Sequence, residues 1–293
     1  MDSGTVRPRR SALYMPASNA RALEKAHGLA ADVVILDLED AVAPGAKPAA
    51  RLAACEAIGA GGFGRREVVI RVNGLASDWG AADIAAAAGA GPDAILVPKI
   101  DSAADVANYD ERLAGAPARV RLWVMIETCA AMFELGAIAR AARTTRLAAF
   151  VLGINDLAKE MRARQTPDRA QFLPFMAMSV AAARSEGLVV LDGVHNEIED
   201  LEGLAGACRQ AADLGFDGKT LIHPSHLDVC NRAFTPSAAE VAWAKAVVQA
   251  FGEPQNAGVG ALRVEGRLAE RLHLEQSRQL IALAEAIGAA AGG

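Results

Sequence analysis

The 293-residue sequence has few aromatic residues, no paired cysteine motif and no long apolar run. Because aromatic residues make up only 4% of the chain, bases or sugars stacked on aromatic platforms are not expected. The four cysteines form no CxxC motif and are expected to be reduced thiols. No apolar run reaches the ~18 residues of a membrane span, and no hydrophobic signal region follows the N-terminal arginines. These absences predict a soluble, cytoplasmic protein with no membrane partner.

Clusters of basic charge are also missing. The net charge is −5, and the lysines and arginines are scattered along the chain, which argues against nucleic acid as a partner. The hydrophobic share of 52% is sufficient for a large core. The length fits one large α/β domain, since closed barrels of this class need about 250 residues.

One unit recurs along the chain: a β-rich run, a polar tip and an alanine-rich amphipathic stretch. The eight β-rich runs are 11–16, 33–38, 67–72, 94–98, 121–126, 147–154, 188–191 and 218–222. No GxGxxG turn follows the first run, which disfavours the main alternative, a doubly wound sheet. We therefore predict an α/β fold, a (β/α)8 TIM barrel over residues 1–234. Residues 235–293 are predicted to form a C-terminal helical extension that acts as a lid, a swapped arm on a neighbouring subunit or a plain outer helix.

The polar tips carry most of the chain's unusual chemistry. In a barrel they ring one face, where barrel enzymes hold their active sites. Two apolar runs end in Glu127 and in Asn155-Asp156. Since neighbouring parallel strands lie ~4.8 Å apart, the two carboxylates can meet, and an oxygen-only pair suits Mg²⁺. The alternative is that both acids are ordinary helix caps or first-turn residues.

The tips resemble those of a known family. The matching segments are Leu-Tyr-Met-Pro-Ala-Ser-Asn (13–19), Leu-Asp-Leu-Glu-Asp-Ala-Val-Ala-Pro (36–44), Arg-Val-Asn-Gly (71–74), Val-Pro-Lys (97–99), Met-Ile-Glu-Thr (125–128), Leu-Gly-Ile-Asn-Asp-Leu (152–157) and Gly-Lys-Thr-Leu-Ile-His-Pro (218–224). They are similar to the citrate lyase β-subunit-like group of the HpcH/HpaI aldolase superfamily, which includes malyl-CoA and citramalyl-CoA lyases. The resemblance covers nearly the whole chain in order.

This resemblance implies a role for each tip. Glu127 and Asp156 are expected to bind Mg²⁺, with Mn²⁺ as an alternative, and Arg71 to steady the thioester oxygen as it becomes an enolate. A CoA thioester is the implied substrate. Asp40, together with Glu39, is expected to hold metal-bound water or Arg71. Tyr14 and Lys25 are expected to touch CoA. Asn155, Ile222 and His223 are expected to line the substrate.

The main hypothesis is an Mg²⁺-dependent carbon–carbon lyase. It would cleave a 3-hydroxyacyl-CoA of the malyl-CoA or citramalyl-CoA type to acetyl-CoA and a 2-keto acid by retro-Claisen chemistry. In the related lyases an aspartate on the C-terminal segment, reaching a neighbour's site, is the acid/base; here the matching position holds Glu270. Glu270 is therefore either catalytic or a surface residue on a helix. Asn19 stands where malyl-CoA lyases have an arginine near the CoA phosphates.

Two alternatives keep the same site. The first is a malyl-CoA thioesterase or a malate-synthase-like hydrolase, which requires a water molecule placed on the thioester. The second is a citrate lyase β subunit that acts on an acyl-carrier-protein thioester within a complex. Carrier binding predicts a positive rim at the barrel mouth, for which the candidates are Arg21, Lys25, Lys47 and Arg51. A homo-oligomer, either a trimer or a hexamer, is expected from the family.

Overall fold

The computed structural model describes residues 6–291, which form two compact units. One unit is Arg9–Phe234, and the other consists of residues 6–8 together with the segment from Thr235 onward. The first unit contains a closed parallel sheet, and the second contains two long helices and a β-hairpin. No helix within residues 6–291 combines the length and the apolar character needed to cross a membrane.

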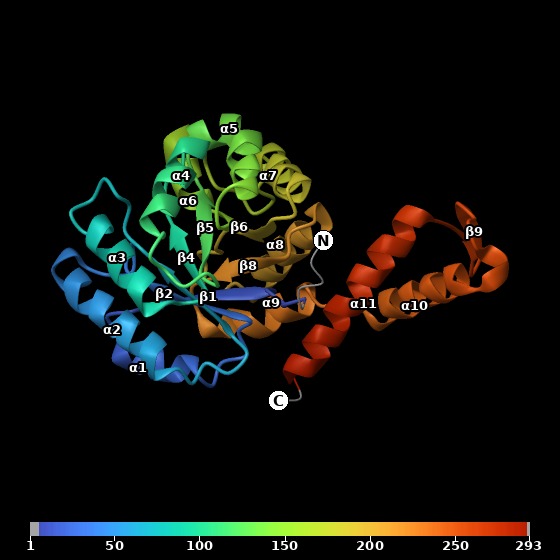
Figure 1. Ribbon diagram of the computed structural model, residues 1–293, viewed down its shortest axis with the longest axis horizontal. Helices are drawn as coiled ribbons and strands as arrows, with labels where there is room; N and C mark the ends of the chain where they lie inside the picture. Colours follow the sequence, from blue (N-terminus) through green and yellow to red (C-terminus); the bar gives the residue numbers. More distant parts are fainter. Residues whose placement is uncertain (1–5, 292–293) are drawn as a thin grey trace. The chain divides into compact units, whose positions relative to one another are not determined.

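The first unit is a closed barrel of eight parallel strands (Figure 1). Each strand pairs with the next one along the chain, and β8 returns to pair with β1. The predicted (β/α)8 barrel is therefore confirmed. The strands are β1 (Ser11–Pro16), β2 (Val33–Asp37), β3 (Glu67–Arg71), β4 (Ala94–Val97), β5 (Arg121–Ile126), β6 (Leu147–Leu152), β7 (Val189–Asp192) and β8 (Gly218–Leu221).

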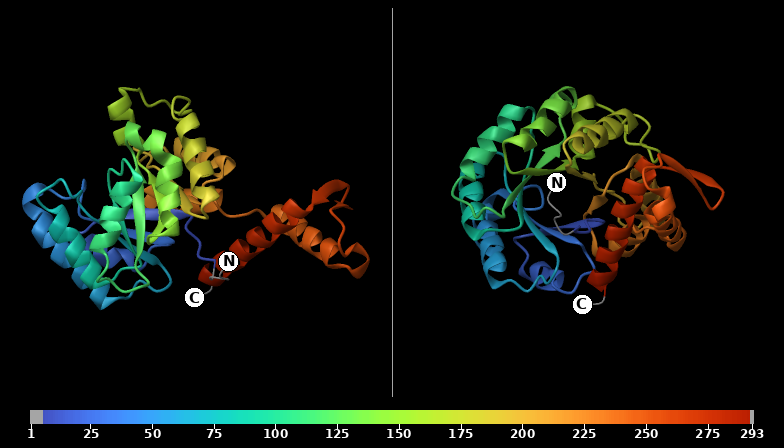
Figure 2. Two further views of the ribbon diagram at one scale, coloured as in Figure 1. Left: turned by 45° about the horizontal axis from the view of Figure 1, so that its top comes forward. Right: turned by 45° about the vertical axis from the view of Figure 1, so that its right-hand side comes forward.

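Helices follow the strands and lie outside the sheet, as Figure 2 shows. Alanine-rich sequences suit this position because small side chains let a helix pack closely on the strands. The helices are α1 (Ala20–Ala26), α2 (Lys47–Ala60), α3 (Gly80–Ala90), α4 (Ala103–Arg112), α5 (Cys129–Arg140), α6 (Ile154–Met161), α7 (Leu173–Ser185), α8 (Leu201–Leu214) and α9 (Leu227–Ala233).

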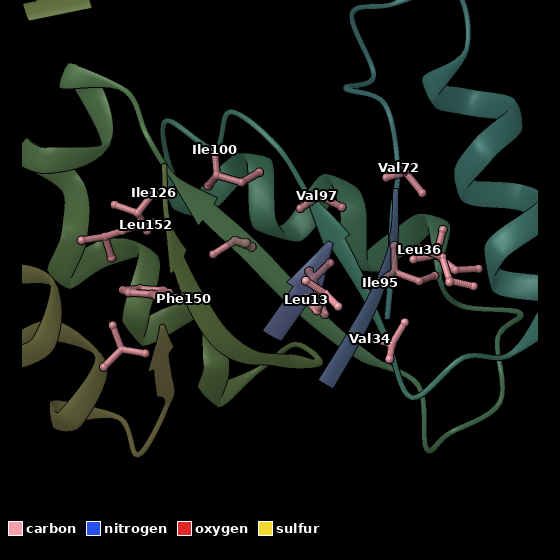
Figure 3. Close-up of a cluster of buried hydrophobic side chains, with 14 of the residues drawn as sticks. Leu13, Val34, Leu36, Val72, Ile95, Val97, Ile100, Ile126, Phe150 and Leu152 are labelled. Carbon is pink, nitrogen blue, oxygen red and sulfur yellow. The ribbon is translucent and has the colours of Figure 1, made fainter. Parts of the chain in front are cut away.

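Alternation along the strands separates two apolar cores. Val33 and Ile35 point into the barrel, where Trp123 is fully buried. Val34 and Leu36 point outward and pack with the helices (Figure 3). Because side chains alternate with a period of two, the next inward position on β2 after Val33 and Ile35 is Asp37. The corresponding inward position on β3 is Arg71, and the strand pairing sets these two residues opposite each other.

The sixth strand is shorter than the sequence predicted. The expected run 147–154 ends at Leu152, and Gly153 caps the helix α6. Asp156 therefore lies in the first turn of α6 and not at the tip of a strand. This position agrees with the alternative that Asp156 is a first-turn residue of a helix. A carboxylate in that turn still faces the carboxyl edge of the sheet.

The second unit contains α10 (Ala238–Gly252), β9 (Ala261–Val264), β10 (Arg267–Glu270) and α11 (Arg271–Ala291). Its small core consists of Val247, Val264, Ala269 and Leu274. The hairpin β9–β10 was not expected, because the segment reads as a loop between two helices. Its two turn residues, Glu265 and Gly266, both have positive φ angles, 46° and 83°, as a tight two-residue hairpin requires.

A buried ion cluster joins β7, β8 and the loop before α7. Asp192 accepts from Lys219 Nζ at 2.7 Å and from Arg169 Nη1 at 2.6 Å, and neither Asp192 nor Lys219 is exposed. Arg169 also donates to the carbonyl of Ala207 on α8. Burial raises the pKa of Asp192, but the two cations outweigh it and hold that pKa below the usual value of 3.8.

We expect Asp192→Ala to lower the free energy of unfolding by about 3–5 kcal/mol, because it leaves Lys219 and Arg169 buried without a counter-charge. Urea denaturation followed by circular dichroism measures this. The exposed Glu199→Ala is the control and should change stability by less than about 0.5 kcal/mol. Since the folded-state pKa of Asp192 is lowered, its contribution is present above pH 3.8 and is lost as the pH falls through the folded-state value. Equal stability of the two variants would contradict this role.

Candidate active site

Arg71 stands at the carboxyl end of β3 and is held by a two-point ion pair. Its Nε and Nη2 atoms donate to the two carboxylate oxygens of Asp37 at 2.6 and 2.7 Å. The Tyr14 ring lies against the guanidinium, with the Arg71 Cζ atom 4.6 Å from the ring centroid. Burial lowers the pKa of Arg71, but Tyr14 and Asp37 raise it by a larger amount, so this side chain stays charged. Burial also raises the pKa of Tyr14, which remains a neutral phenol.

The third nitrogen of Arg71 faces two further acids. Its Nη1 atom lies 2.9 Å from Glu39 Oε2 and 3.2 Å from Asp40 Oδ2, with the sulfur of Met125 at 3.9 Å. The Glu39 side chain is 15% exposed, whereas that of Asp40 is 73% exposed. Burial raises the pKa of Glu39 to about 8; Arg71 opposes this shift, and Asp40 and Glu127 add to it. The loop after β2 therefore presents one shielded and one solvated acid to the same guanidinium.

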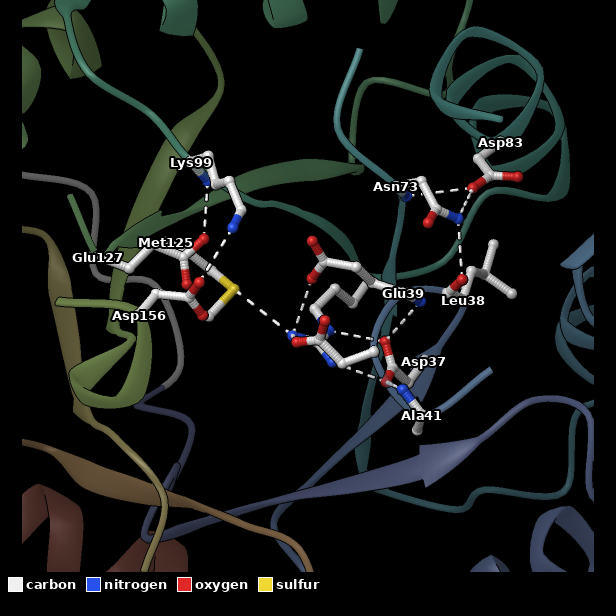
Figure 4. Close-up of polar contacts among 12 residues, drawn as sticks. Asp37, Leu38, Glu39, Ala41, Asn73, Asp83, Lys99, Met125, Glu127 and Asp156 are labelled. Atoms are coloured by element: carbon white, nitrogen blue, oxygen red, sulfur yellow. Dashed lines mark hydrogen bonds and ion pairs between the residues drawn. The ribbon is translucent and has the colours of Figure 1, made fainter. Parts of the chain in front are cut away.

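A buried lysine holds this loop in place. Lys47 Nζ donates to the carbonyl oxygens of Leu38 at 3.0 Å and of Glu39 at 2.7 Å, and to Asn73 Oδ1 at 2.6 Å. Asn73 in turn donates to the carboxylate of Asp83, shown in Figure 4. The hypothesis that Lys47 belongs to a positive rim is therefore not supported by its position, because its ammonium group is buried against these oxygens.

The other three residues of the proposed rim differ in their exposure. Arg51 is partly buried, and its Nε atom lies 2.6 Å from Asp83 Oδ1. Arg21 and Lys25 are exposed on α1, so they remain available to a phosphate or a carrier protein. Asn19 caps α1, where its side chain accepts from the backbone N–H of Ala22.

The predicted metal ligands are joined by one lysine. Glu127, which follows β5 and is buried, accepts a hydrogen bond of 2.9 Å from the backbone N–H of Lys99. Asp156 accepts from Lys99 Nζ at 3.0 Å, and both side chains are partly exposed (Figure 4). Burial and the nearby charge of Asp156 raise the pKa of Glu127 to about 7. Lys99 has a φ of 52°, in the left-handed region, which aims its N–H and its ammonium at the two acids.

A glycine makes room for this pair. A β-carbon on Gly153 would lie 2.3 Å from Glu127 Oε2 and 2.5 Å from Glu127 Cβ. Every other residue would therefore displace the Glu127 side chain. Gly153 belongs to the motif 152–157 but had no predicted function; its position between a strand and a helix was the available signal.

The donor set suits a hard cation. Within residues 6–291 there is no cluster of three or more His, Cys, Asp or Glu side chains arranged to hold a metal ion. Glu127 and Asp156 instead offer two carboxylates with oxygen donors only. Mg²⁺ commonly binds through one or two carboxylates and keeps several water ligands. Burial and, after it, the like charge of Asp156 raise the pKa of Glu127, and a divalent cation would oppose both effects.

The remaining predicted residues lie at separate places. Asn155 exchanges hydrogen bonds with Asn196 at 3.0 and 2.9 Å and accepts from Gln165 at 2.9 Å. Ile222 and His223 follow β8, where Ile222 is 39% exposed and the His223 ring contacts the Ser225 hydroxyl at 2.7 Å. Glu270 is exposed at the end of β10, in the other unit, and its N–H donates to His273. The barrel therefore brings together Tyr14, Asp40, Arg71, Glu127 and Asp156, whereas Glu270 belongs to the other unit.

We expect Lys47→Met to loosen the loop that carries Glu39. The change leaves three buried acceptors without their donor, which costs about 1–3 kcal/mol of unfolding free energy. Hydrogen exchange measured by mass spectrometry should show faster exchange of the amides of Glu39 and Ala41, which donate to Asp37. Lys25→Met, on the exposed face of α1, is the control. Unchanged exchange at residues 38–41 in Lys47→Met would refute the role of this lysine.

Comparison with known proteins places this barrel in a family. Residues 10–224 match the HpcH/HpaI aldolase/citrate lyase family model. Proteins named (3S)-malyl-CoA thioesterase from strains of Cereibacter sphaeroides are 44–45% identical over 282 residues, 96% of each chain. A protein named L-malyl-CoA/beta-methylmalyl-CoA lyase from the same species is 35% identical over 310 residues, 97% of each chain. The chain belongs to the HpcH/HpaI aldolase/citrate lyase family and is an enzyme of that superfamily.

A solved structure shows the same fold with ligands bound. The protein CitE from Mycobacterium tuberculosis, in complex with magnesium, acetoacetate and coenzyme A, is 31% identical. It superposes with a TM-score of 0.74 over 94% of this chain and 97% of that one. The recognition of the family from the barrel tips is confirmed.

The lyase hypothesis, however, is wrong as the main interpretation. The relatives at 44–45% identity over nearly the whole chain are thioesterases, whereas the lyase match lies at 35%. The tips that carried the prediction belong to the site shared by the whole family, so they do not separate carbon–carbon cleavage from hydrolysis. The acid/base role of Glu270 stays a prediction, because it was derived from the related lyases and the identities do not test single residues.

Proposed function

We propose that this protein is an Mg²⁺-dependent thioesterase that hydrolyses (3S)-malyl-CoA or a similar 3-hydroxyacyl-CoA. The observation that carries the proposal is 44–45% identity to (3S)-malyl-CoA thioesterases over 96% of both chains. The barrel supports it by gathering a fixed guanidinium and a carboxylate pair at one mouth. Homo-oligomerisation remains a prediction.

Glu127 and Asp156 are the residues that would hold the cation, Mg²⁺ or Mn²⁺. When bound, the ion would act as a Lewis acid on oxygens of the substrate. The two carboxylates offer only oxygen donors, and the backbone N–H of Lys99 holds the Glu127 carboxylate in position. A solved relative in complex with magnesium, acetoacetate and coenzyme A supports magnesium as the cation.

Arg71 would stabilise the negative charge that forms on the thioester oxygen. Asp37 occupies its Nε and Nη2 atoms, so the guanidinium cannot rotate, and Nη1 is the atom directed at the mouth. A donor that is already oriented loses no energy to reorganisation when the charge develops. From the family motifs, Tyr14 and Lys25 would contact the CoA portion, and Asn155, Ile222 and His223 would line the acyl group.

Product analysis by mass spectrometry tests the proposed reaction. The purified protein is incubated with (3S)-malyl-CoA in the presence of Mg²⁺ or of a chelator. We expect free CoA and malate with Mg²⁺, and at least a tenfold slower reaction with chelator, because the carboxylate pair then lacks its cation. Acetyl-CoA with glyoxylate as the only products would refute the thioesterase proposal.

Gly153→Ala tests the cation site through binding. The added methyl group displaces Glu127, so Mg²⁺ affinity should fall about 10- to 100-fold. Isothermal titration calorimetry of the purified protein with MgCl₂ measures the affinity without any substrate. Gly59→Ala on α2 is the matched control, because its β-carbon would meet open space. Equal affinities for both variants would rule out Glu127 as a ligand.

A further inference from the structure

Thioester hydrolysis needs a group that removes a proton from the attacking water. Arg71 cannot do this, because its partners hold it in the charged form. Glu127 and Asp156 are the proposed cation ligands. The base must therefore be another side chain at the mouth, close to the Arg71 nitrogen that would receive the negative charge.

The acids around Arg71 differ in their free oxygens. Both oxygens of Asp37 are engaged twice, by Arg71 and by the backbone N–H groups of Glu39 and Ala41. Asp40 lies mostly in solvent, where bulk water competes for any proton it handles. Glu39 uses only Oε2, on Arg71 Nη1 at 2.9 Å, and no hydrogen bond to its Oε1 atom is formed by residues 6–291. It is therefore a shielded carboxylate with one oxygen available.

The backbone of Glu39 is fixed from both sides. Its N–H donates to Asp37 Oδ1 at 2.9 Å, and its carbonyl oxygen accepts from Lys47 Nζ at 2.7 Å. Figure 4 shows its carboxylate between the Asp37 side of the site and the side that carries Glu127 and Asp156. A water molecule on Oε1 would therefore lie near both the oxyanion donor and the carboxylate pair.

Burial also gives Glu39 the proton affinity that a base needs. It raises the pKa of Glu39 to about 8, and a cation on Glu127 and Asp156 would bring that value down toward neutrality. A general base is most effective when its pKa is near the working pH. The charged and titratable groups that act on Glu39 are Arg71 on β3, Asp37 and Asp40 on β2 and its loop, Glu127 after β5, Lys99 after β4, Tyr109 on α4 and Tyr14 on β1.

We propose that Glu39 is the general base of the hydrolysis, an assignment that rests on the proposed thioesterase function. Its carboxylate takes one proton from water as the water oxygen bonds to the thioester carbon. The electrons of the carbonyl double bond move to its oxygen, beside Arg71. When the intermediate collapses, the carbon–sulfur bond breaks and the CoA sulfur takes the proton from Glu39. The products are CoA and a carboxylic acid, which releases its own proton to solvent.

Glu39→Gln tests this role, with the exposed Glu56→Gln on α2 as the matched control. Glutamine keeps an oxygen for Arg71 but cannot accept the proton, so kcat for CoA release should fall at least 100-fold while KM changes less than threefold. The control should match wild type. Thermal unfolding of each variant checks that the barrel is intact, and Glu39→Asp, which retains a carboxylate, should keep more activity than Glu39→Gln.

The pH profile separates a base from a residue that only positions Arg71. In the wild type, kcat/KM should fall as the pH drops below the pKa of the base, because the protonated acid cannot accept a proton. This acid limb should be absent from Glu39→Gln. A kcat within threefold of wild type, or a slow variant that keeps the same acid limb, would overturn the assignment. A wild-type enzyme that releases no CoA from (3S)-malyl-CoA would overturn the thioesterase proposal first, and Glu39 as its base with it.

Discussion

The buried ion pair between Arg71 and Asp37 is the interaction on which the barrel mouth depends. Parallel pairing of β2 and β3 sets the two residues opposite each other, and alternation turns both side chains inward. Two short hydrogen bonds fix the guanidinium plane and leave Nη1 as its outward-facing nitrogen. Removing either partner would leave an unpaired charge inside the barrel. The positions of Glu39, Asp40 and the Tyr14 ring all follow from that fixed plane.

Different surroundings give similar carboxylates different chemistry. The Asp37 carboxylate is fully hydrogen-bonded and serves as a structural anion. The Glu39 carboxylate has one ion-pair contact, with Arg71, and a pKa raised by burial. Glu127 and Asp156 repel each other and both bind Lys99, an arrangement that favours a divalent cation. In the proposed enzyme, four of the five acids at the mouth therefore divide into an anchor, a base and two ligands, and the fifth, Asp40, is solvated.

The polar tips of the strands predicted the family correctly but not the reaction. Repeated β-rich runs and their polar ends predicted the closed barrel, because parallel strands with one repeating connection place all carboxyl ends on one face. The hairpin β9–β10 was missed, since its turn residues, Glu265 and Gly266, lack the usual Asn-Gly signal. Lyase chemistry was predicted from the resemblance of motifs that contain Arg71, Glu127 and Asp156, but a guanidinium and a cation held by two carboxylates would serve either reaction. Whether water reaches the carbonyl carbon depends on groups that surround the motifs.

The sequence alone determined the strand repeat, the inward alternation and the acids at the strand ends, because these depend on local periodicity. Tertiary structure decided which of those acids share a partner. Only folding shows that Lys47 is buried beneath the Glu39 loop and not on a positive rim. Only folding shows that Gly153 leaves space for Glu127 from the neighbouring strand. Such contacts join residues 8 to 26 positions apart along the chain, and no local periodicity shows that they meet.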